Sequence, residues 1–446
     1  MTSNLQQYVK AIKNSKFTQR IGHVAHFYGL VLESNGPEAF HGERCDIYSK
    51  YHTKPIPAEV IGIKEGKVML MTYGETRGIG VGSEVVATGK TVDIQVGDQL
   101  LGRVIDAFGK PLDGKPIEHS QKTYPLYAEP MNPLQRPRID RVLETGVRAI
   151  DTLLTVGRGQ RVGIFAGSGV GKSTLLGMIS RQMNADINVI ALIGERGREV
   201  LDFIELNLGE SGLKRSIVVV ATSDQPALVR AHAAFTATAI AEYYRDQGKD
   251  VVLTMDSITR FAMAQREIGL AAGEPPTARG YTPSVFALLP RLLERGGTDQ
   301  GGGSITAFYT VLVEGDDLND PVSDSIRAIL DGSIVLSRDL SNRGHYPSID
   351  LLLSNSRLFR HLTKSNERED ALSLIELLNS YESSKDMIEI GAYKEGSNPQ
   401  LDRAIQKMPD INNFLRQEFD EVGSRIEAYK MLHQLLTTQN RSIGLQ

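Results

Sequence analysis

The sequence has almost no cysteine and no long hydrophobic run. Its one cysteine, Cys45, excludes an internal disulfide framework and any zinc or iron–sulfur site built from several cysteines, and we expect it to be a buried small side chain. No apolar stretch approaches the ~18 residues that span a bilayer, and the polar start MTSNLQQYVK lacks the pattern of a secretory signal peptide. We therefore expect a soluble protein of the cytoplasm.

An excess of charge of one sign is also missing. The chain has 50 Lys and Arg against 54 Asp and Glu, a formal net charge of −4, which argues against an obligate nucleic-acid binder. Its nine histidines form no H-E-x-x-H motif, so a zinc enzyme has no support, and the G-x-S-x-G motif of serine hydrolases is absent. The length of 446 residues, 41% of them hydrophobic, suffices for roughly two to four domains with cores of their own.

The residue pattern divides the chain into three parts. In residues 1–86, after a short segment that can form an amphipathic helix, β-branched and aromatic runs are cut by Gly and Pro, which predicts a small antiparallel β-barrel. A Gly- and Pro-rich passage then predicts a linker that leads into a second domain, residues 87–360. Residues 361–446 are charged and carry apolar residues at spacings of three and four, which predicts a C-terminal α-helical domain.

The middle part alternates apolar runs with longer helical stretches. We expect helices such as Ser173–Met183 and Pro226–Gln247. Near-continuous apolar strands separated by helices are typical of an α/β fold with a parallel, doubly wound sheet that is covered on both faces. The expected strands are Val162–Phe165, Val189–Ile193, Ile217–Ala221, Val251–Met255, Ile305–Val313 and Ser333–Leu336.

The strongest motif is FAGSGVGKSTLL at residues 165–176, which follows an apolar strand and opens a helix. It matches the phosphate-binding pattern G-x-x-x-x-G-K-[ST], except that Ala166 replaces the first Gly, which is allowed where φ is negative. Gly167, Gly169 and Gly171 leave the backbone bare, so that successive N–H groups can surround a phosphate at a helix N-terminus. The sequence therefore predicts a loop that binds the phosphates of a nucleotide.

Four side chains complete a site for nucleotide hydrolysis. Lys172 would reach the β- and γ-phosphates, and the Ser173 hydroxyl would bind Mg²⁺. Asp256 follows the apolar run Val251–Met255, where a second group for the metal is expected. Glu195 follows another expected strand, so its carboxylate can lie at the same sheet edge and orient or deprotonate the attacking water.

The order and spacing of several motifs resemble the catalytic-subunit family of hexameric rotary ATPases. These motifs are AGSGVGKST, GERGREV, VVLTMDSITRFA, PPTARGYTPSVF, DDLNDP and GHYPSIDLLLSNSR, and YPSIDLLLSNS at 346–356 fits the family's signature. The resemblance covers essentially the whole chain and implies a β-barrel, a RecA-like P-loop core and a helical C-terminal domain. Within the family, GERGREVLDFIE and IEIGAYKEGSNPQLDRAI are similar to ATPases of type III protein export, and MTYGETRGIGVGSEV is similar to their flagellar members.

The resemblance also implies roles for individual residues. Glu195 would activate water, Arg196 would support the phosphate region, and Arg260 would approach the γ-phosphate. Tyr346 matches the aromatic residue that stacks on adenine. Arg357 matches the arginine finger, which reaches the nucleotide of the neighbouring subunit and makes catalysis depend on assembly. The phosphates would be held by Gly167, Ser168, Gly169, Val170, Gly171, Lys172, Ser173 and Thr174, with Asp256 binding Mg²⁺ through water.

By the same resemblance, the protein would be an ATP hydrolase that forms a homohexamer and energises the export of flagellar proteins. The implied partners are a central-stalk coiled coil, a stator-like regulatory protein bound by the N-terminal segment, the export gate and chaperone–cargo complexes. The loop GLAAGEPPTARGYTP would line the central hole of the ring. The protein would then lie at the cytoplasmic face of the inner membrane as a peripheral component.

Four alternatives stay open. A virulence injectisome ATPase is a close cousin within the same branch. A synthase β subunit is expected to read GERTREGND where this chain reads GERGREV, and a non-catalytic ring subunit such as the synthase α subunit lacks the glutamate that Glu195 supplies. The ring helicase Rho shares the nucleotide core, but it requires a basic, aromatic RNA-binding barrel, and residues 17–86 carry aromatic residues without a clear basic cluster.

Overall fold

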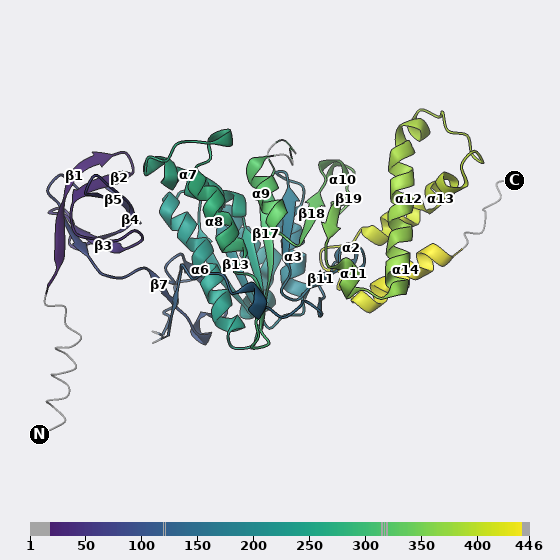
Figure 1. The fold of residues 1–446 in the computed structure, drawn as a ribbon. Coiled ribbons are helices and arrows are strands. Elements are labelled where there is room, and N and C mark those ends of the chain that lie inside the picture. Colours follow the sequence, from purple (N-terminus) through teal and green to yellow (C-terminus); the bar gives the residue numbers. More distant parts are fainter. Residues whose placement is uncertain are drawn as a thin grey trace, which may run out of the picture.

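The computed structural model describes residues 18–438 except 119, 121, 314, 316, 318 and 319. The chain forms three parts in a row, with a barrel at one end, an α/β part in the middle and a group of helices at the other end (Figure 1). The N-terminal segment, with its expected helix and stator contact, lies outside the described residues. None of the helices in the described ranges combines the length and the apolar character that a membrane crossing requires.

Six antiparallel strands close into the N-terminal barrel, as the sequence predicts. Buried and exposed residues tend to alternate along them, because one face of each strand points into the barrel. The interior is filled by side chains such as Val24, Leu32, Cys45, Ile47 and Leu70. The strands are β1 (Arg20–Tyr28), β2 (Val31–Asn35), β3 (Arg44–Tyr48), β4 (Ile56–Lys64), β5 (Lys67–Thr72) and β6 (Glu84–Ala87), and they follow the order β1-β2-β5-β4-β3-β6 around the barrel.

The middle part contains a nine-stranded sheet with the order β19-β18-β12-β17-β15-β13-β14-β8, and β16 pairs with β17 beside this path. The strands from β18 to β8 are parallel, and β19 runs antiparallel to β18 at the edge. All six expected strands belong to this sheet. They are β12 (Arg161–Ala166), β13 (Ile187–Ile193), β14 (Ser216–Ala221), β15 (Asp250–Asp256), β17 (Ser304–Leu312) and β18 (Gly332–Leu336), and β8 (Arg103–Asp106), β16 (Gly297–Thr298) and β19 (Ile349–Ser356) join them.

The passage between the barrel and the sheet is more than the linker that its composition predicts, because it adds β8 to the sheet beside β14. It also contains β7 (Asp93–Gln95), which pairs with β9 (Thr123–Pro125), and β10 (Val142–Leu143), which pairs with β11 (Val156–Gly157). Short 3₁₀ turns occur at η1 (Asp98–Leu100) and η2 (Pro133–Gln135). The barrel is thereby tied to one edge of the sheet.

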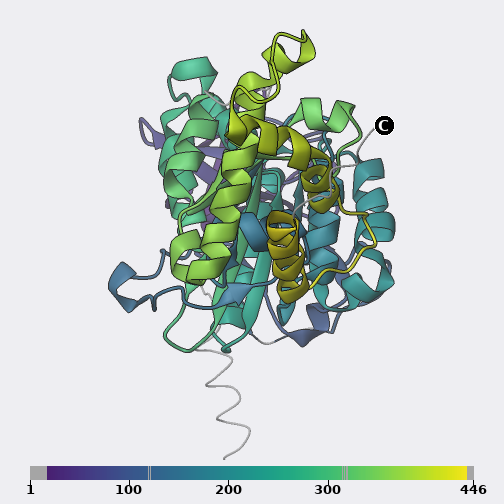
Figure 2. The same cartoon turned by 90° about the vertical axis from the view of Figure 1, so that its right-hand side faces the viewer.

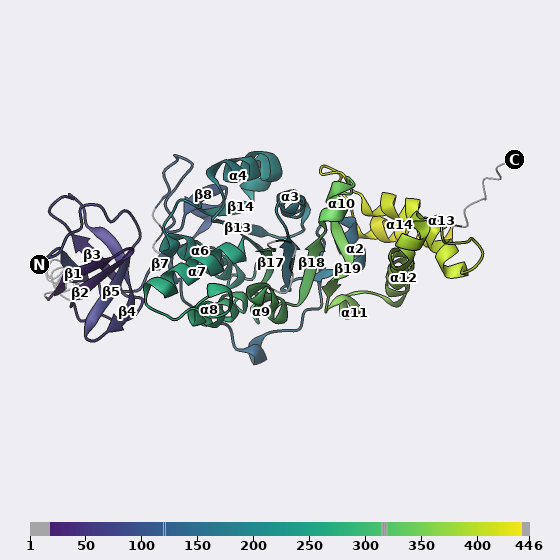
Figure 3. The same cartoon turned by 90° about the horizontal axis from the view of Figure 1, so that it is seen from above.

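Helices cover both faces of the sheet (Figure 3). On one face lie α3 (Lys172–Gln182), α4 (Gly197–Asp202), the π-helical turn η3 (Phe203–Leu208) and α5 (Gly209–Lys214). On the other lie α6 (Ala227–Arg245), α7 (Ile258–Ala271), the turn η4 (Ala278–Gly280), α8 (Pro283–Leu293) and α9 (Pro321–Ile329). Helices α3 and α6 correspond to the two helices that the sequence predicts, which completes the doubly wound arrangement.

The chain ends in helices that pack against the far edge of the sheet and face the viewer in Figure 2. Their apolar residues, among them Leu374, Ala404, Ile411 and Leu432, belong to the same buried cluster as Leu175 of α3. The predicted α/β fold with a β-barrel and a helical C-terminal domain is therefore confirmed. These helices are α12 (Ser365–Glu389), α13 (Pro399–Leu415) and α14 (Arg425–Thr437), and they lie beyond α2 (Arg148–Leu153), α10 (Arg338–Asn342) and α11 (Phe359–Leu362).

Candidate active site

The phosphate loop lies between the end of β12 and the start of α3, at the carboxyl ends of the parallel strands. Ala166 ends β12 and is not among the residues with positive φ, which is why alanine is tolerated in place of the motif's first glycine. Gly169 and Gly171 have φ angles of 78° and 93°, in the left-handed region that glycine adopts without strain. Gly171 is the N-cap of α3, so the loop presents its backbone at a helix N-terminus.

An open cleft of about 890 Å³ lies along the loop. It brings together most of the residues that the sequence singles out. Val170 differs from them, because its side chain is buried in the core and only its backbone belongs to the loop. The expected residues that line the cleft are Gly167, Ser168, Gly169, Gly171, Lys172, Ser173, Thr174, Glu195, Arg196 and Arg260.

Lys172 lies between two acidic side chains, Glu195 in the lining of the cleft and the buried Asp256 behind it. Its Nζ lies 2.5 Å from Asp256 Oδ1 and 3.4 Å from Glu195 Oε1. The Thr310 hydroxyl donates a further hydrogen bond of 2.8 Å to Asp256 Oδ1 from the neighbouring strand β17. Burial acts to lower the pKa of Lys172, but the two carboxylates outweigh it and hold that pKa above its usual value. Lys172 is therefore a cation at the place where phosphates would enter.

Glu195 is a carboxylate that can change its protonation near neutral pH. Burial raises its pKa to about 7; Lys172 opposes the rise, and the nearby Asp256 adds to it. A general base is most effective when its pKa lies close to the working pH. Glu195 thus has the position and the proton affinity of a group that orients water and takes its proton.

The oxygen donors beside the loop fit a magnesium ion. The Ser173 side chain is exposed at the start of α3, and Asp256 ends β15, two strands from β12. Mg²⁺ prefers such hard oxygen ligands and is usually bound by one or two protein groups together with substrate phosphates. Ser173 and Asp256 are thus the residues that could hold it.

The two arginines of the cleft that the sequence singles out differ in their surroundings. The Arg196 side chain is 83% exposed at the mouth of the cleft and lies 3.9 Å from Glu199. Arg260 on α7 is only partly exposed and packs beneath Gly194, and its Nε is buried without a hydrogen-bond partner among the described residues. An unsatisfied guanidinium nitrogen beside a phosphate loop is a candidate partner for a phosphate oxygen.

Tyr346 lies outside the cleft but next to the loop. It lines a second cavity of about 310 Å³ together with Gly171, Thr174 and Phe419. A Cβ atom added to Gly171 would lie 3.4 Å from the tyrosine ring, so ring and loop are already in contact. The two cavities share Gly171 and Thr174, which suits a ligand with its phosphates in the cleft and a flat base beside Tyr346.

The structure does not bring Arg357 to this site. Its side chain is exposed just after β19, and its amide donates a 3.0 Å hydrogen bond to the carbonyl of Asp331. Asp331 in turn is bonded to Arg161, the first residue of β12, whereas the phosphate loop follows the last residue of that strand. Arg357 and the loop of the same chain thus lie at opposite ends of the parallel strands.

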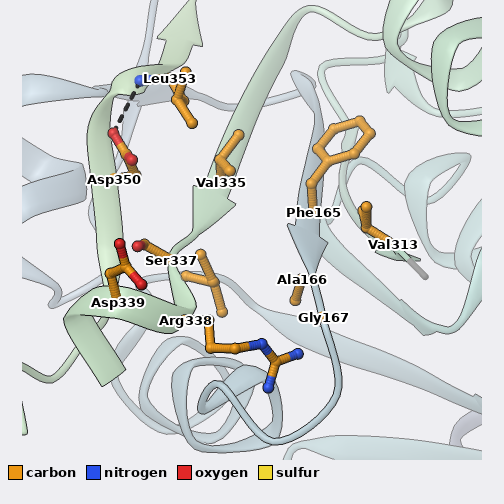
Figure 4. Close-up of a pocket in the computed structure, with 11 residues that line it drawn as sticks. Phe165, Ala166, Gly167, Val313, Val335, Ser337, Arg338, Asp339, Asp350 and Leu353 are labelled. Carbon is orange, nitrogen blue, oxygen red and sulfur yellow. Dashed lines mark hydrogen bonds between the residues drawn. The ribbon is translucent and has the colours of Figure 1, made fainter. Parts of the chain in front are cut away.

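Two residues near the loop were missed by the sequence reasoning. Arg338 lines the cleft, and its Nη1 donates to the carbonyl of Ser168 at 3.2 Å. It also borders a further cavity of about 340 Å³ beside the loop (Figure 4). Arg338 comes shortly after the expected strand that ends at Leu336, so its position at a carboxyl strand end was a usable signal. The buried Ser348, which donates to the carbonyl of Val170 at 2.6 Å, gave no such signal.

Comparisons with known proteins match each part of the chain. Residues 146–356 match the model of the ATP synthase alpha/beta family, nucleotide-binding domain. Residues 24–89 match the beta-barrel domain of the same family, and residues 363–434 match the T3SS EscN ATPase C-terminal domain. The matches follow the order of barrel, sheet and C-terminal helices described above.

Similar proteins span nearly the full length. The chain is 55% identical over 417 residues to the flagellum-specific ATP synthase of Bacillus subtilis, covering 93% of this chain and 95% of that protein. It superposes on the assembled ATPase EscN of the enteropathogenic E. coli type III secretion system with a TM-score of 0.88 and 46% identity, covering 93% of this chain and all of that one. With EscN in complex with its central stalk EscO, the TM-score is 0.85 at 45% identity and the same coverage. The chain therefore belongs to the ATP synthase alpha/beta family and is an ATP-hydrolysing enzyme of its flagellar and type III secretion branch.

Proposed function

We propose that this enzyme is the Mg²⁺-dependent ATPase of a flagellar type III export apparatus and that it works as a ring of six copies. One observation carries the proposal: Lys172, Glu195 and Asp256 converge beside the phosphate loop. This arrangement supplies a cation for phosphates and carboxylates for metal and water at a single sheet edge. The ATP-binding domain in this proposal is residues 87–360, between a barrel of residues 1–86 and a helical domain of residues 361–446.

In the proposed mechanism, the amides of residues 167–174 and the Lys172 ammonium bind the β- and γ-phosphates of ATP. The incoming phosphates compete with Asp256 and Glu195 for Lys172, which releases both carboxylates for their own roles. Ser173, and Asp256 through water, hold Mg²⁺, which when bound neutralises phosphate charge. Glu195 then orients the attacking water and accepts its proton.

Four further side chains, two of them in the cleft and two outside it, complete the proposed site. Tyr346 stacks on the adenine in the cavity that it shares with the loop. Arg260, with its buried and unsatisfied Nε, approaches the γ-phosphate, and the exposed Arg196 supports the phosphate region from the mouth of the cleft. Arg357 acts as the arginine finger on the nucleotide of the next copy in the ring. Each active site is then complete only at the interface between two copies.

The proposed partners follow from the ring. The assembled ATPase EscN, a similar protein, forms a complex with its central stalk EscO, and we propose a comparable coiled-coil stalk here. The loop before α8, in which Arg279 pairs with Asp317 at 2.8 Å and Asp320 at 3.1 Å, would line the hole that holds it. We further propose a stator-like regulatory protein at the N-terminus, and the export gate and chaperone–cargo complexes as the clients at the cytoplasmic face of the inner membrane.

A steady-state phosphate-release assay tests the enzymatic part. Wild-type protein with Mg²⁺ and ATP should release phosphate, and Glu195→Gln should bind ATP but lose at least about 99% of the turnover, because the water loses its base. Glu210→Gln on the exposed surface of α5 is a matched control that should keep full activity. Undiminished turnover in Glu195→Gln would remove the assignment of the water-activating group.

The injectisome ATPases are a second candidate, because EscN shares 46% of its sequence with this chain. The higher identity of 55% to a flagellar relative favours the flagellar assignment. The test is complementation: the chain should restore motility to a strain that lacks its flagellar ATPase. Restoration of secretion in an injectisome mutant, without motility in the flagellar one, would reverse the assignment.

A further inference from the structure

The segment between β18 and β19 places two hydrogen-bond donors against carbonyl groups of the phosphate loop. The Ser348 hydroxyl donates to the carbonyl of Val170 at 2.6 Å, and the Arg338 guanidinium donates to the carbonyl of Ser168 at 3.2 Å. Ser348 is only 2% exposed, so its hydroxyl has little access to water as an alternative partner. Both acceptors are backbone atoms, so neither bond depends on the identity of the loop side chains.

These two bonds fix the peptide planes that matter for phosphate binding. In a trans peptide the carbonyl of one residue and the N–H of the next point in opposite directions. The peptides after Ser168 and Val170 are trans, since neither is among the cis peptides of the chain. When their carbonyls are held by Arg338 and Ser348, the N–H groups of Gly169 and Gly171 are directed away from these two donors, and both glycines line the cleft.

The glycines are the reason why such a restraint is needed. Gly169 and Gly171 have positive φ, and glycine changes its backbone conformation at little steric cost. A peptide plane beside such a residue can rotate and turn its carbonyl, with its negative partial charge, toward the phosphate site. The bond from Ser348 makes that rotation unfavourable, because the carbonyl of Val170 would lose its partner in a buried position. Arg338 restrains the more exposed carbonyl of Ser168 in the same way.

The donors themselves are held in place. The amide of Ser337 donates to the carbonyl of Ser348 at 2.8 Å, which closes the base of the segment. The Ser337 side chain then caps α10 by accepting a 3.4 Å bond from the amide of Leu340. Arg338 is the first residue of α10, so the same contacts fix where its side chain begins.

We propose that Ser348 and Arg338 are positioning residues that preset the phosphate loop for ATP by fixing the peptide planes in front of Gly169 and Gly171. They act through the backbone amides and take no part in the chemical step. The inference rests on the proposed binding of ATP phosphates by this loop. It predicts that loss of either donor weakens the binding of every ligand with phosphate groups, whether or not the ligand has a base. The loss of affinity should not arise from a loss of fold stability.

Ser348→Ala is the decisive variant, because the change is small, uncharged and outside the cleft. The dissociation constants of ATP, ADP and inorganic tripolyphosphate should each rise about 3- to 10-fold, the effect of one buried hydrogen bond. The midpoint of thermal unfolding without ligand should fall only modestly, as it does when a comparable buried hydroxyl bond is lost elsewhere in the fold. Ser348→Thr keeps a hydroxyl donor and should bind the three ligands nearly as the wild type does.

Ser216→Ala is the matched control. Ser216 is also fully buried and also donates to a backbone carbonyl, that of Gly212 at 2.7 Å, but it lies on β14 away from the loop. It should leave the three dissociation constants unchanged. Arg338→Ala should weaken binding of the same ligands, and Arg338→Lys, which keeps a donor and the charge, should recover part of the loss.

The outcomes separate the inference from the proposed function. If wild-type protein fails to bind ATP and tripolyphosphate, the proposed function is wrong. If the wild type binds them and Ser348→Ala binds equally well, the loop needs no such restraint and the inference is wrong, while the function stands. A loss of thermal stability in Ser348→Ala with unchanged affinity would also overturn it, because the bond would then be merely structural.

Discussion

The amide of Arg357 donates a hydrogen bond to the carbonyl of Asp331 at the end of the parallel strands opposite the phosphate loop. Asp331 is bonded to Arg161 at the start of β12, and the loop begins after Ala166 at its end. The two ends of this strand are roughly 17 Å apart at the rise of a parallel strand, which is more than an arginine side chain spans. The guanidinium of Arg357 therefore cannot reach a phosphate that the loop of its own chain binds.

The first prediction is that two inactive variants restore each other. Arg357→Ala lacks the proposed finger and Glu195→Gln lacks the proposed water-activating group, and each alone should lower kcat at least about 100-fold. In rings assembled from a 1:1 mixture, roughly a quarter of the interfaces join an intact Glu195 to an intact Arg357, if the copies mix at random. Phosphate release from the mixture should therefore rise well above that of either variant.

A second mixture controls for this result. Glu195→Gln combined with Lys172→Ala removes two groups of the same half-site, so no interface in mixed rings regains a complete set from those two variants. Phosphate release should then stay at the level of the single variants. Equal activity in both mixtures, or no recovery in the first, would contradict a finger supplied by the neighbour.

The second prediction concerns pH. The pKa of Glu195 is raised to about 7, chiefly by burial, and only the ionised carboxylate can accept a proton from water. The ratio kcat/KM reports the free enzyme, so it should fall as pH decreases through about 7 and level off above it. Initial rates at low ATP concentration between pH 5.5 and 9, roughly the range around this pKa, give the profile.

The raised pKa of Glu195 also makes the free energy of unfolding depend on pH. A carboxyl group whose folded pKa is raised binds its proton more tightly in the folded state, so this group favours folding below its unfolded pKa and loses that contribution as pH rises through about 7. Glu195→Gln should thus be the more stable protein in chemical denaturation at alkaline pH, with little difference below about pH 4. A pH profile of kcat/KM that is flat across neutrality would contradict the assigned role.

Much of the fold and the centre of the site could be predicted because their signals are local. Strands such as β13 and β15 are fully buried, so they appear in the sequence as continuous apolar runs. Parallel strands end at one edge, so Glu195 and Asp256 could be placed beside Lys172 from their positions after such runs. The short strand β8 could not be predicted, because its pairing with β14 is long-range and its surroundings are rich in Gly and Pro.

The hydrogen bonds that other segments make to the phosphate loop could not be predicted from the sequence, for a different reason. Ser348 and Val170 are 178 residues apart, and their bond joins a side chain to a backbone carbonyl. A carbonyl is present in every residue, so no residue type at position 170 marks it as an acceptor. The hydrogen bond from Thr310 to Asp256 could not be predicted either, because Thr310 lies within the apolar strand β17 and nothing in the sequence marks its partner.

The third prediction concerns Cys45. The thiol is fully buried in the barrel, and burial, with a contribution from Glu43, raises its pKa to about 12. A thiol-specific reagent requires an accessible thiolate, so native protein at pH 8 should react at least about 100-fold more slowly than denatured protein. Absorbance during treatment with a disulfide reagent, with and without guanidinium chloride, measures both rates. Rapid stoichiometric reaction of the native protein would show that the barrel opens.

The fourth prediction concerns the contact between the barrel and the nucleotide-binding part. Glu59 of β4 accepts hydrogen bonds from His232 of α6 at 2.7 Å and from Tyr73 at 2.6 Å, and Tyr127 reaches its other oxygen at 3.4 Å. Burial acts to raise the pKa of Glu59, but His232 and the tyrosine hydroxyls outweigh it and hold the pKa below the usual value. Glu59 is 6% exposed, so its removal leaves the polar groups around it buried without a partner.

Glu59→Ala should therefore lower the free energy of unfolding by about 3 kcal/mol, and proteases should cut more readily between the barrel and the sheet. A group with a depressed folded pKa stabilises the fold above its unfolded value and loses that effect as pH falls through the folded one. The difference between wild type and Glu59→Ala in chemical denaturation should accordingly be full at pH 7 and shrink below about pH 4. The control is Glu33→Ala in the same barrel, whose partner Lys67 is partly exposed, and which should change little. If both variants behave alike, Glu59 does not hold the barrel on α6.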